Sequence, residues 1–207
     1  MTQSILGNIS AEDFLSNYWQ KKPLLIRGAI PNFEAPIDGD ELAGLALEPE
    51  VESRLVVSDK WTLEHGPFDE NRFSTLPPSH WTLLVQAVDL WVPEVGALMK
   101  HFDFLPPWRI DDIMVSYAED GGSVGPHFDY YDVFLLQGVG QRRWEIGAVC
   151  DAESPLLKDA GLKVLAEFEA LEEWILEPGD MLYLPPMVAH HGVAMGACTT
   201  FSVGFRA

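Results

Sequence analysis

From Trp108 to the end, the chain is built from short apolar segments separated by turns rich in glycine and proline. Turns of this kind stand at 119–122, 138–140 and 177–180. This pattern is typical of an antiparallel sandwich or jelly roll, in which short strands pair through tight turns. We therefore expect a mainly β fold, with strands near 109–117, 133–137, 142–146, 173–176, 181–184 and 199–205.

The first half of the chain predicts helices that support the sheets from outside. Ser10 precedes an apolar stripe and resembles a helix cap. Asp40–Leu47 is a second expected helix, and a third is expected to start at Ser79 and run through Val88 and beyond. Short strands are expected at 24–26, 52–57 and 61–65. We read the chain as a single domain, 1–207, with helical support over 1–107 and a β core over 108–207.

The charge of the chain restricts its partners. The 13 basic and 32 acidic residues give a formal net charge of −19. A chain this acidic is not expected to bind nucleic acid directly, whereas a basic protein partner suits it. The alternative is that the charge only maintains solubility.

The cysteines and the N-terminus bear on the compartment. Cys150 and Cys198 lack the spacing of metal ligands and are expected to be core thiols in a reducing environment. The sequence begins without the basic and apolar segments of a signal peptide, and no apolar run reaches membrane-spanning length. We therefore expect a cytoplasmic protein without a membrane partner.

The residues 125–129, Gly-Pro-His-Phe-Asp, contain the pattern that points to chemistry. His127 and Asp129 lie two residues apart, so on a strand both side chains point to the same side. A second histidine would complete two imidazoles and one carboxylate, the ligand set of non-haem Fe(II) oxygenases. Alone, an HxD pair is more often a pair of surface hydrogen-bonding residues.

Other residues could complete such a site. His190 and His191 follow a strand-like run, and at most one of them can point at a metal held by the first pair. Arg142 could bind a dicarboxylate through a bidentate pair, although it and Arg143 could equally be surface charges. Hydroxyl side chains in the strands could bind a cosubstrate carboxylate or simply be satisfied core groups; these are Ser116, Thr200 and Ser202. The sequence contains neither a phosphate-binding GxxxxGK[ST] loop nor a GxSxG nucleophile elbow.

Taken together, these motifs resemble the bacterial JmjC-type ribosomal oxygenases, which are cupin-like Fe(II)/2-oxoglutarate hydroxylases. The resemblance covers nearly the whole chain, and the joint motif set is highly specific. It is carried by the segments 19–24, 111–116, 125–129, 131–134, 137–138, 142–144, 178–186 and 202–206.

The resemblance implies a double-stranded β-helix in which His127, Asp129 and His190 bind iron. It implies that Arg142 holds the distal carboxylate of 2-oxoglutarate, with Ser116 and Thr200 as further candidates at the cosubstrate. His190 is preferred to His191 because it matches the family's histidine after Pro-Pro-x-x-x.

The resemblance also implies an activity and a partner. It implies hydroxylation of an arginine in a large-subunit ribosomal protein, a basic substrate that suits the charge of this chain. Glu119, Asp120, Tyr130 and Asp132 are the candidates to receive an arginine side chain. Two alternatives stay open: demethylation of N-methyl-lysine, and a non-catalytic metal-binding cupin that recognises a basic protein.

The chain also departs from the family. Typical members continue into a helical dimerisation region and a winged-helix domain, whereas this sequence ends at Ala207. Those two regions are therefore expected to be absent. A homodimer is expected of the longer relatives rather than of this chain.

Overall fold

The computed structural model of the chain describes residues 4–158 and 160–206 and consists of two antiparallel sheets. The large sheet has eight strands in the order β1-β9-β6-β11-β5-β4-β2-β3, and the small sheet has three in the order β10-β7-β8. The strands are β1 (Leu24–Ile26), β2 (Ser53–Val57), β3 (Thr62–His65), β4 (Trp81–Val85), β5 (Ile110–Ala118), β6 (Asp132–Gln137), β7 (Gln141–Val149), β8 (Glu172–Leu176), β9 (Met181–Leu184), β10 (Val188–Met195) and β11 (Cys198–Phe205).

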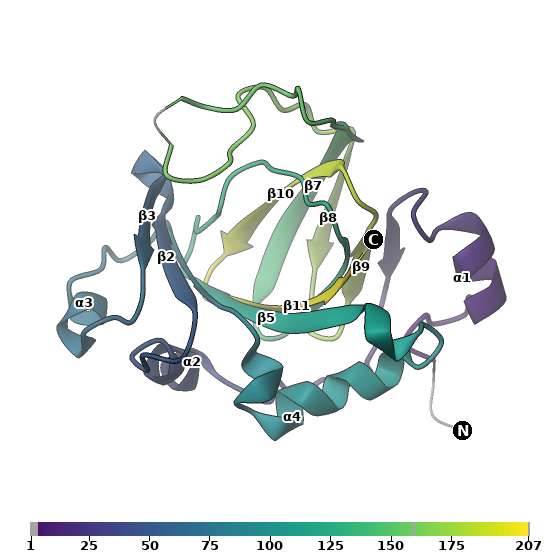
Figure 1. Cartoon of the computed structure of the whole chain (residues 1–207), viewed down its shortest axis with the longest axis horizontal. Helices are drawn as coiled ribbons and strands as arrows, with labels where there is room; N and C mark the ends of the chain where they lie inside the picture. Colours follow the sequence, from purple (N-terminus) through teal and green to yellow (C-terminus); the bar gives the residue numbers. More distant parts are fainter. Residues whose placement is uncertain (1–3, 159, 207) are drawn as a thin grey trace.

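The two sheets face one another, and the helices cover the outer face of the large sheet (Figure 1). These helices are short: α1 (Ala11–Asn17), α2 (Gly39–Leu45), α3 (Glu70–Ser74) and α4 (Pro93–Gly96), with 3-10 turns η1 (Ser58–Lys60), η2 (Val88–Leu90), η3 (Ala97–Phe102) and η4 (Pro107–Arg109). They all precede β5, as the sequence predicted. The expected mainly β jelly roll is confirmed.

Strand β6 shows how the sheets and helices share the core. Phe134 and Leu136 pack into the cluster between the large sheet and the helices, where Phe14 of α1 also lies. Val133 and Leu135 point the other way, into the cluster between the two sheets. Because both faces of β6 are covered, its central residues 133–136 are all apolar instead of alternating with polar residues.

One predicted helix is wrong. The segment after Ser79 was expected to be helical, but Trp81–Val85 forms β4 and pairs with both β2 and β5. The run is short and buried on both faces, so its apolar residues show no period that separates helix from strand. His80 and Ala87, at either end, have φ of 63° and 51°, values that interrupt a helix.

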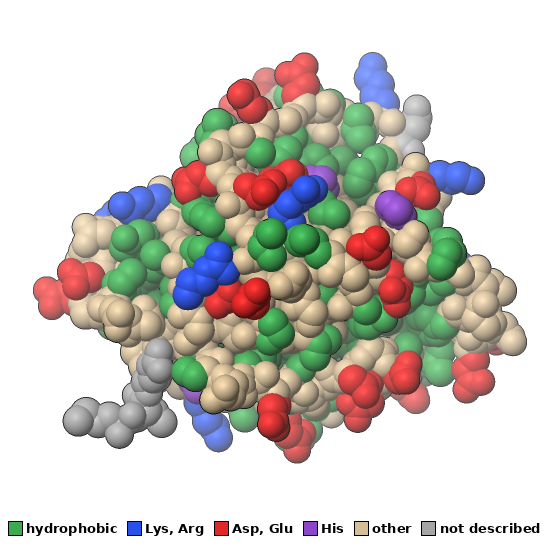
Figure 2. Space-filling model, turned by 180° about the vertical axis from the view of Figure 1, so that it is seen from behind, with side chains coloured by type: hydrophobic (Ala, Val, Ile, Leu, Met, Phe, Trp, Pro, Cys, Tyr) green, Lys and Arg blue, Asp and Glu red, His purple; other side chains and the backbone are tan. Residues whose placement is uncertain are grey.

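Acidic side chains are scattered over the rear face of the molecule and do not gather in one patch (Figure 2). Exposed apolar side chains also lie on the surface of the molecule, including Leu90 and Trp108. None of the helices within the described residues has the length and hydropathy needed to cross a bilayer.

Candidate metal centre

A backbone bridge joins His127, in the segment between β5 and β6, to His190 of β10. The amide of His127 donates to the carbonyl of His190 at 3.0 Å, and the amide of His190 donates back to the carbonyl of His127 at 2.8 Å. The bridge brings the two imidazole rings to 4.2 Å between centroids. Gly125 turns the chain into this bridge with φ of 81°, and a Cβ there would approach Val164 at 2.9 Å. Backbone pairing therefore fixes the two histidines, which are 63 positions apart in the sequence.

Asp129 completes a cluster with the two histidines. Its Oδ2 lies 3.9 Å from Nε2 of His127 and 3.6 Å from Nε2 of His190. One ligand atom from each residue lies within 4.8 Å of the others. Ligand atoms about 2 Å from a shared ion lie roughly 3 to 4 Å apart, so these residues fit one cation with small adjustments. Three protein ligands leave the remaining positions of an octahedral ion free for other groups.

Hydrogen bonds prepare both imidazoles for a metal. Nδ1 of His127 lies 2.9 Å from the carbonyl of Gly125, and Nδ1 of His190 lies 2.9 Å from that of Val188. A carbonyl only accepts, so each Nδ1 carries the proton and each Nε2 keeps a lone pair directed at the cluster. Burial, reinforced by His127, lowers the pKa of His190 to about 4, which keeps this imidazole neutral at physiological pH.

The structure separates His190 from His191. His191 points to the other face of β10, where its Nδ1 lies 2.9 Å from a carboxylate oxygen of Glu145. Phe168 packs edge-on against its ring. His191 therefore takes part in a contact on the opposite face, and the sequence alone, before any resemblance, did not distinguish the two histidines.

A cavity of about 550 Å³ extends from the three residues between the sheets. Arg142 lines it and is 5% exposed. Its Nη1 and Nη2 make only long contacts of 3.5 Å, with Oγ of Ser116 and Sγ of Cys198, and its Nε has no partner among the described residues. Because a buried guanidinium normally pairs with an anion, this arrangement favours an anionic ligand in the cavity.

The neighbouring Arg143 has a different environment. Its guanidinium lies 3.7 Å from Glu145 and 3.7 Å from Glu173, and its side chain is 39% exposed. Alternation along β7 thus places one arginine in the cavity and the next on the surface. The resemblance, rather than the spacing, selects Arg142 over Arg143.

The hydroxyl residues predicted beside Arg142 also line the cavity. Ser116 of β5 pairs with Thr200 of β11, and Ser202 lies two residues further along the same face of β11. Oγ1 of Thr200 lies 3.4 Å from Oε1 of Gln137, while Ser116 meets Arg142. The structure therefore brings together all six of the predicted site residues.

The residues predicted to receive an arginine side chain do not line this cavity. Asp132 is fully buried and accepts from Tyr183 and Gln20. Glu119 accepts from the hydroxyl of Tyr117, and Asp120 from the amide of Gly196. Tyr130 is exposed, and its neighbour Tyr131 lines the cavity instead.

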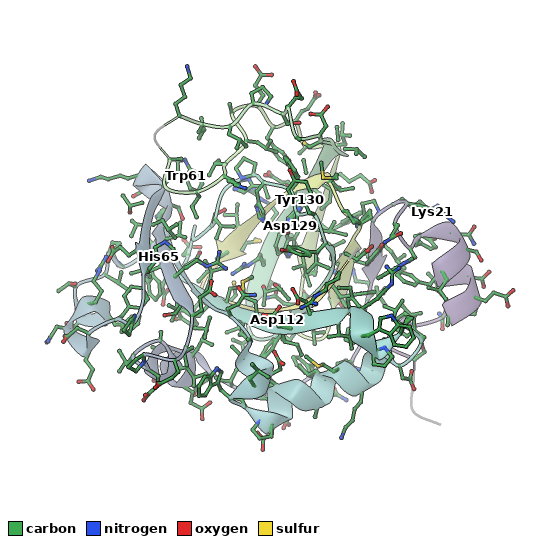
Figure 3. All side chains as sticks on the ribbon, viewed as in Figure 1. Lys21, Trp61, His65, Asp112, Asp129 and Tyr130 are labelled. Carbon is green, nitrogen blue, oxygen red and sulfur yellow. The ribbon has the colours of Figure 1, made fainter. Side chains whose placement is uncertain are left out.

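The cavity contains a carboxylate that sequence reasoning missed, Asp112 of β5 (Figure 3). One oxygen, Oδ2, accepts from Nε2 of Gln86 at 2.6 Å and from the amide of Ala87 at 2.9 Å. The other oxygen, Oδ1, has no hydrogen-bond partner among the described residues. Burial raises the pKa of Asp112 above its usual range, against the effect of the Gln86 hydrogen bond. The period-two alternation 112, 114, 116 along β5 was the signal that could have identified it.

Comparisons with known proteins agree with this geometry. The sequence profile described as the JmjC domain matches residues 97–207, more than half of the chain. The chain belongs to the JmjC domain family. Its fold also superposes on a solved structure described as YcfD, a ribosomal oxygenase from Escherichia coli, in complex with cobalt and 2-oxoglutarate, with a TM-score of 0.87 and 46% identity. That match covers 97% of this chain and 52% of the other.

Two sequence relatives of this JmjC chain have names that mention the ribosome. The ribosomal protein uL16 3-hydroxylase of Escherichia coli is 48% identical over 94% of this chain and 52% of its own length. The probable ribosomal oxygenase of Haemophilus influenzae is 43% identical over 96% of this chain and 50% of its own. The JmjC chain thus spans about half the length of the curated relatives that it matches.

Proposed function

We propose that this chain is an Fe(II)- and 2-oxoglutarate-dependent oxygenase that hydroxylates an arginine side chain of a large-subunit ribosomal protein. The observation that carries the proposal is one cavity holding three kinds of group. At its centre is a cluster that fits a metal, with a buried unpaired arginine on one side and a half-buried carboxylate on another. The names of the relatives supply the ribosomal protein as the class of substrate. Such a substrate places the reaction in the cytoplasm.

The donor atoms assign the two small partners. His127, Asp129 and His190 would hold the iron, because two neutral imidazoles and a carboxylate match the Fe(II) ligand set. Arg142 would bind the distal carboxylate of 2-oxoglutarate, helped by the hydroxyls of Ser116 and Thr200. When bound, iron and 2-oxoglutarate supply with dioxygen the oxidising power that converts a C–H bond to C–OH.

Asp112 gives the site its preference for a cationic side chain. A guanidinium that enters the cavity can donate to the open oxygen, Oδ1, while the apolar stem lies against Met114 and Tyr131. The protein's task is thus to orient one C–H bond and to exclude water, and the cavity walls are suited to both.

Mass spectrometry of large-subunit ribosomal proteins tests the proposal. The proteins are incubated with the chain, Fe(II) and 2-oxoglutarate. We expect one peptide to gain the mass of one oxygen, on arginine, with succinate released in equal amount. Asp112→Asn should lose this product but keep 2-oxoglutarate binding, because it changes only the group opposite the metal. No added oxygen on any protein would contradict the assigned substrate.

The same experiment separates the alternatives. Loss of one methylene from a methylated lysine would identify a demethylase, which needs the same iron and cosubstrate. No succinate under any condition would leave a metal-binding module that recognises a basic protein.

A further inference from the structure

Asp112 is held by a chain of hydrogen bonds that begins at a second arginine in the cavity. Nη2 of Arg54 on β2 donates to Oε1 of Gln86 at 2.9 Å, and Nε2 of Gln86 donates to Oδ2 of Asp112 at 2.6 Å. All three side chains line the same cavity. The amide orientation is fixed, because the oxygen of Gln86 must face the cation and its NH₂ must face the carboxylate.

The backbone supports this arrangement at Gln86. The amide of Gln86 donates to the carbonyl of Glu52 at 2.9 Å. The next residue, Ala87, has φ of 51° and donates its own amide to the same oxygen of Asp112. Two donors thus converge on Oδ2 from adjacent residues, and both leave Oδ1 free.

Arg54 has no carboxylate partner within ion-pair distance among the described residues. Its other contact is with the sulfur of Met114, at 3.7 Å. If Arg54 reached Asp112 directly, the ion pair would neutralise the carboxylate and occupy the oxygen that faces the ligand. Gln86 separates the two charges, so that the cation stabilises the carboxylate through one amide without masking it.

From these contacts we infer that Arg54 and Gln86 are positioning residues, which orient Asp112 and keep it ionised so that its open oxygen can receive a cationic side chain. This inference rests on the proposed function for its ligand, but the hydrogen-bond relay exists without the ligand. Neither residue has to touch the substrate for the relay to act.

Other charged groups also act on Asp112. Asp111 on its own strand and Asp89 of η2 both oppose its ionisation, and Asp111 is itself paired with Arg206. Glu52 and Asp129 also line the cavity. Arg54 and Arg142 are the cations that line the same cavity, and Arg54 is connected to the carboxylate through Gln86.

The direct test is the titration of the Asp112 carboxyl carbon by NMR in the whole chain, assigned with Asp112→Asn. Gln86→Met keeps the length of the side chain and removes both hydrogen bonds. We expect the midpoint of the titration to rise by about one pH unit, the effect of losing one hydrogen bond to a charged group. Arg54→Met should raise the midpoint by less, and Arg54→Lys should restore it.

The matched control is Glu52→Gln, a change at the same cavity that leaves the relay intact; because it removes a negative charge, its midpoint should not rise above that of the wild type. An unchanged midpoint in Gln86→Met would overturn the relay. With ribosomal proteins as substrate, the pH below which the hydroxylation rate falls should rise in Gln86→Met by the same amount as the midpoint; we call this part of the pH–rate profile the acidic limb. Succinate release without protein substrate should not move.

Failure of the proposed function can be distinguished from failure of the relay. If the wild type oxidises no ribosomal protein, the proposed function fails while the NMR titration still decides the relay. If the midpoint rises but the acidic limb stays fixed, the relay exists and its assigned role in binding the substrate is wrong.

Discussion

At the scale of single residues, adjacent side chains of the same type have different surroundings because strand side chains alternate. Arg142 and His190 face the cavity, whereas Arg143 and His191 face outward and contact the same carboxylate, Glu145. Each pair provides an experiment in which the neighbour is the control, with equal size, chemistry and position in the sheet.

Replacing His190 should abolish tight metal binding. His190→Ala removes one of three ligands, and we expect the affinity for Mn(II), measured by calorimetry, to fall more than about 100-fold. His191→Ala should bind Mn(II) within about threefold of the wild type, because its imidazole lies on the other face of β10. Equal losses in the two variants would show that the metal is not held at this cluster.

Replacing Arg142 should weaken the binding of 2-oxoglutarate without affecting the binding of the metal. Arg142→Met removes the charged donors for one carboxylate, so 2-oxoglutarate should bind about 10- to 100-fold more weakly in the presence of Mn(II). Arg143→Met should have little effect. Calorimetric titration with 2-oxoglutarate measures both, and unaltered binding in Arg142→Met would place the anion elsewhere.

The ionised carboxylate of Asp112 should lower the free energy of unfolding at neutral pH. Burial raises its pKa in the folded state above the unfolded value of about 3.9, so the folded state holds the proton more tightly. The contribution of Asp112 to the free energy of unfolding is therefore lost as the pH rises through its unfolded pKa and then its folded pKa. We expect Asp112→Asn to unfold at higher urea concentration than the wild type at pH 7, with a difference that shrinks below about pH 4. A difference that grows on acidification would contradict this sign.

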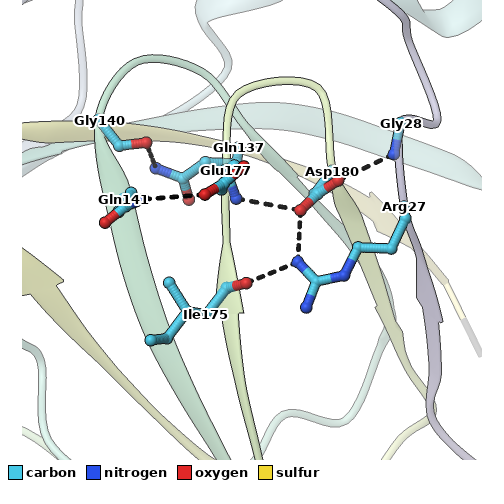
Figure 4. Close-up of polar contacts among 8 residues, drawn as sticks. All are labelled: Arg27, Gly28, Gln137, Gly140, Gln141, Ile175, Glu177 and Asp180. Atoms are coloured by element: carbon cyan, nitrogen blue, oxygen red, sulfur yellow. Dashed lines mark hydrogen bonds and ion pairs between the residues drawn. The ribbon is translucent and has the colours of Figure 1, made fainter.

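At the scale of elements, a buried aspartate joins the turn between β8 and β9 to the first strand (Figure 4). Oδ1 of Asp180 accepts from the amide of Gly28, while Oδ2 accepts from the amide of Glu177 and from Arg27. Arg27 also donates to the carbonyl of Ile175. This network fixes the edge strand β1 against β9, which lies more than 150 residues later in the sequence.

Replacing this carboxylate should destabilise the fold without touching the site. Asp180→Asn leaves an NH₂ where an acceptor is needed, and we expect a loss of about 1 to 3 kcal/mol in the free energy of unfolding in urea. Glu177 lies in the same turn; Glu177→Gln alters only an exposed side-chain contact with Gln141 of β7 and should cost less than about 0.5 kcal/mol. Metal affinity should be the same in both variants. Equal stability of the two would show that the network contributes nothing.

The sequence predicted strands well where turns delimit them and less well where both faces are buried. The candidate metal cluster was predictable because HxD is a local pattern, which the resemblance completed with one distant histidine; in the structure this pair lies in the segment before β6, outside the named strands. Trp81–Val85 was misassigned since its burial comes from tertiary packing on both sides. Asp112 was missed because its role depends on Gln86, 26 positions away, and on which face of β5 meets the cavity.

At the scale of the whole molecule, two sheets that are separate in hydrogen bonding share one site. Arg142 and His190 come from the small sheet, whereas Ser116, Thr200 and Asp112 come from the large one. The bridge between His127 and His190 joins the segment that precedes β6 to β10 of the small sheet, where the metal would sit. Metal and cosubstrate should therefore hold the two sheets together from inside the cavity.

A crystal structure of the chain grown with Mn(II) and 2-oxoglutarate without dioxygen tests the central claim most directly. The account predicts one anomalous peak within about 2.4 Å of Nε2 of His127, Nε2 of His190 and a carboxylate oxygen of Asp129. It also predicts the diacid beside that peak with its far carboxylate on Arg142. Manganese at another site, or a diacid that leaves Arg142 unpaired, would contradict it.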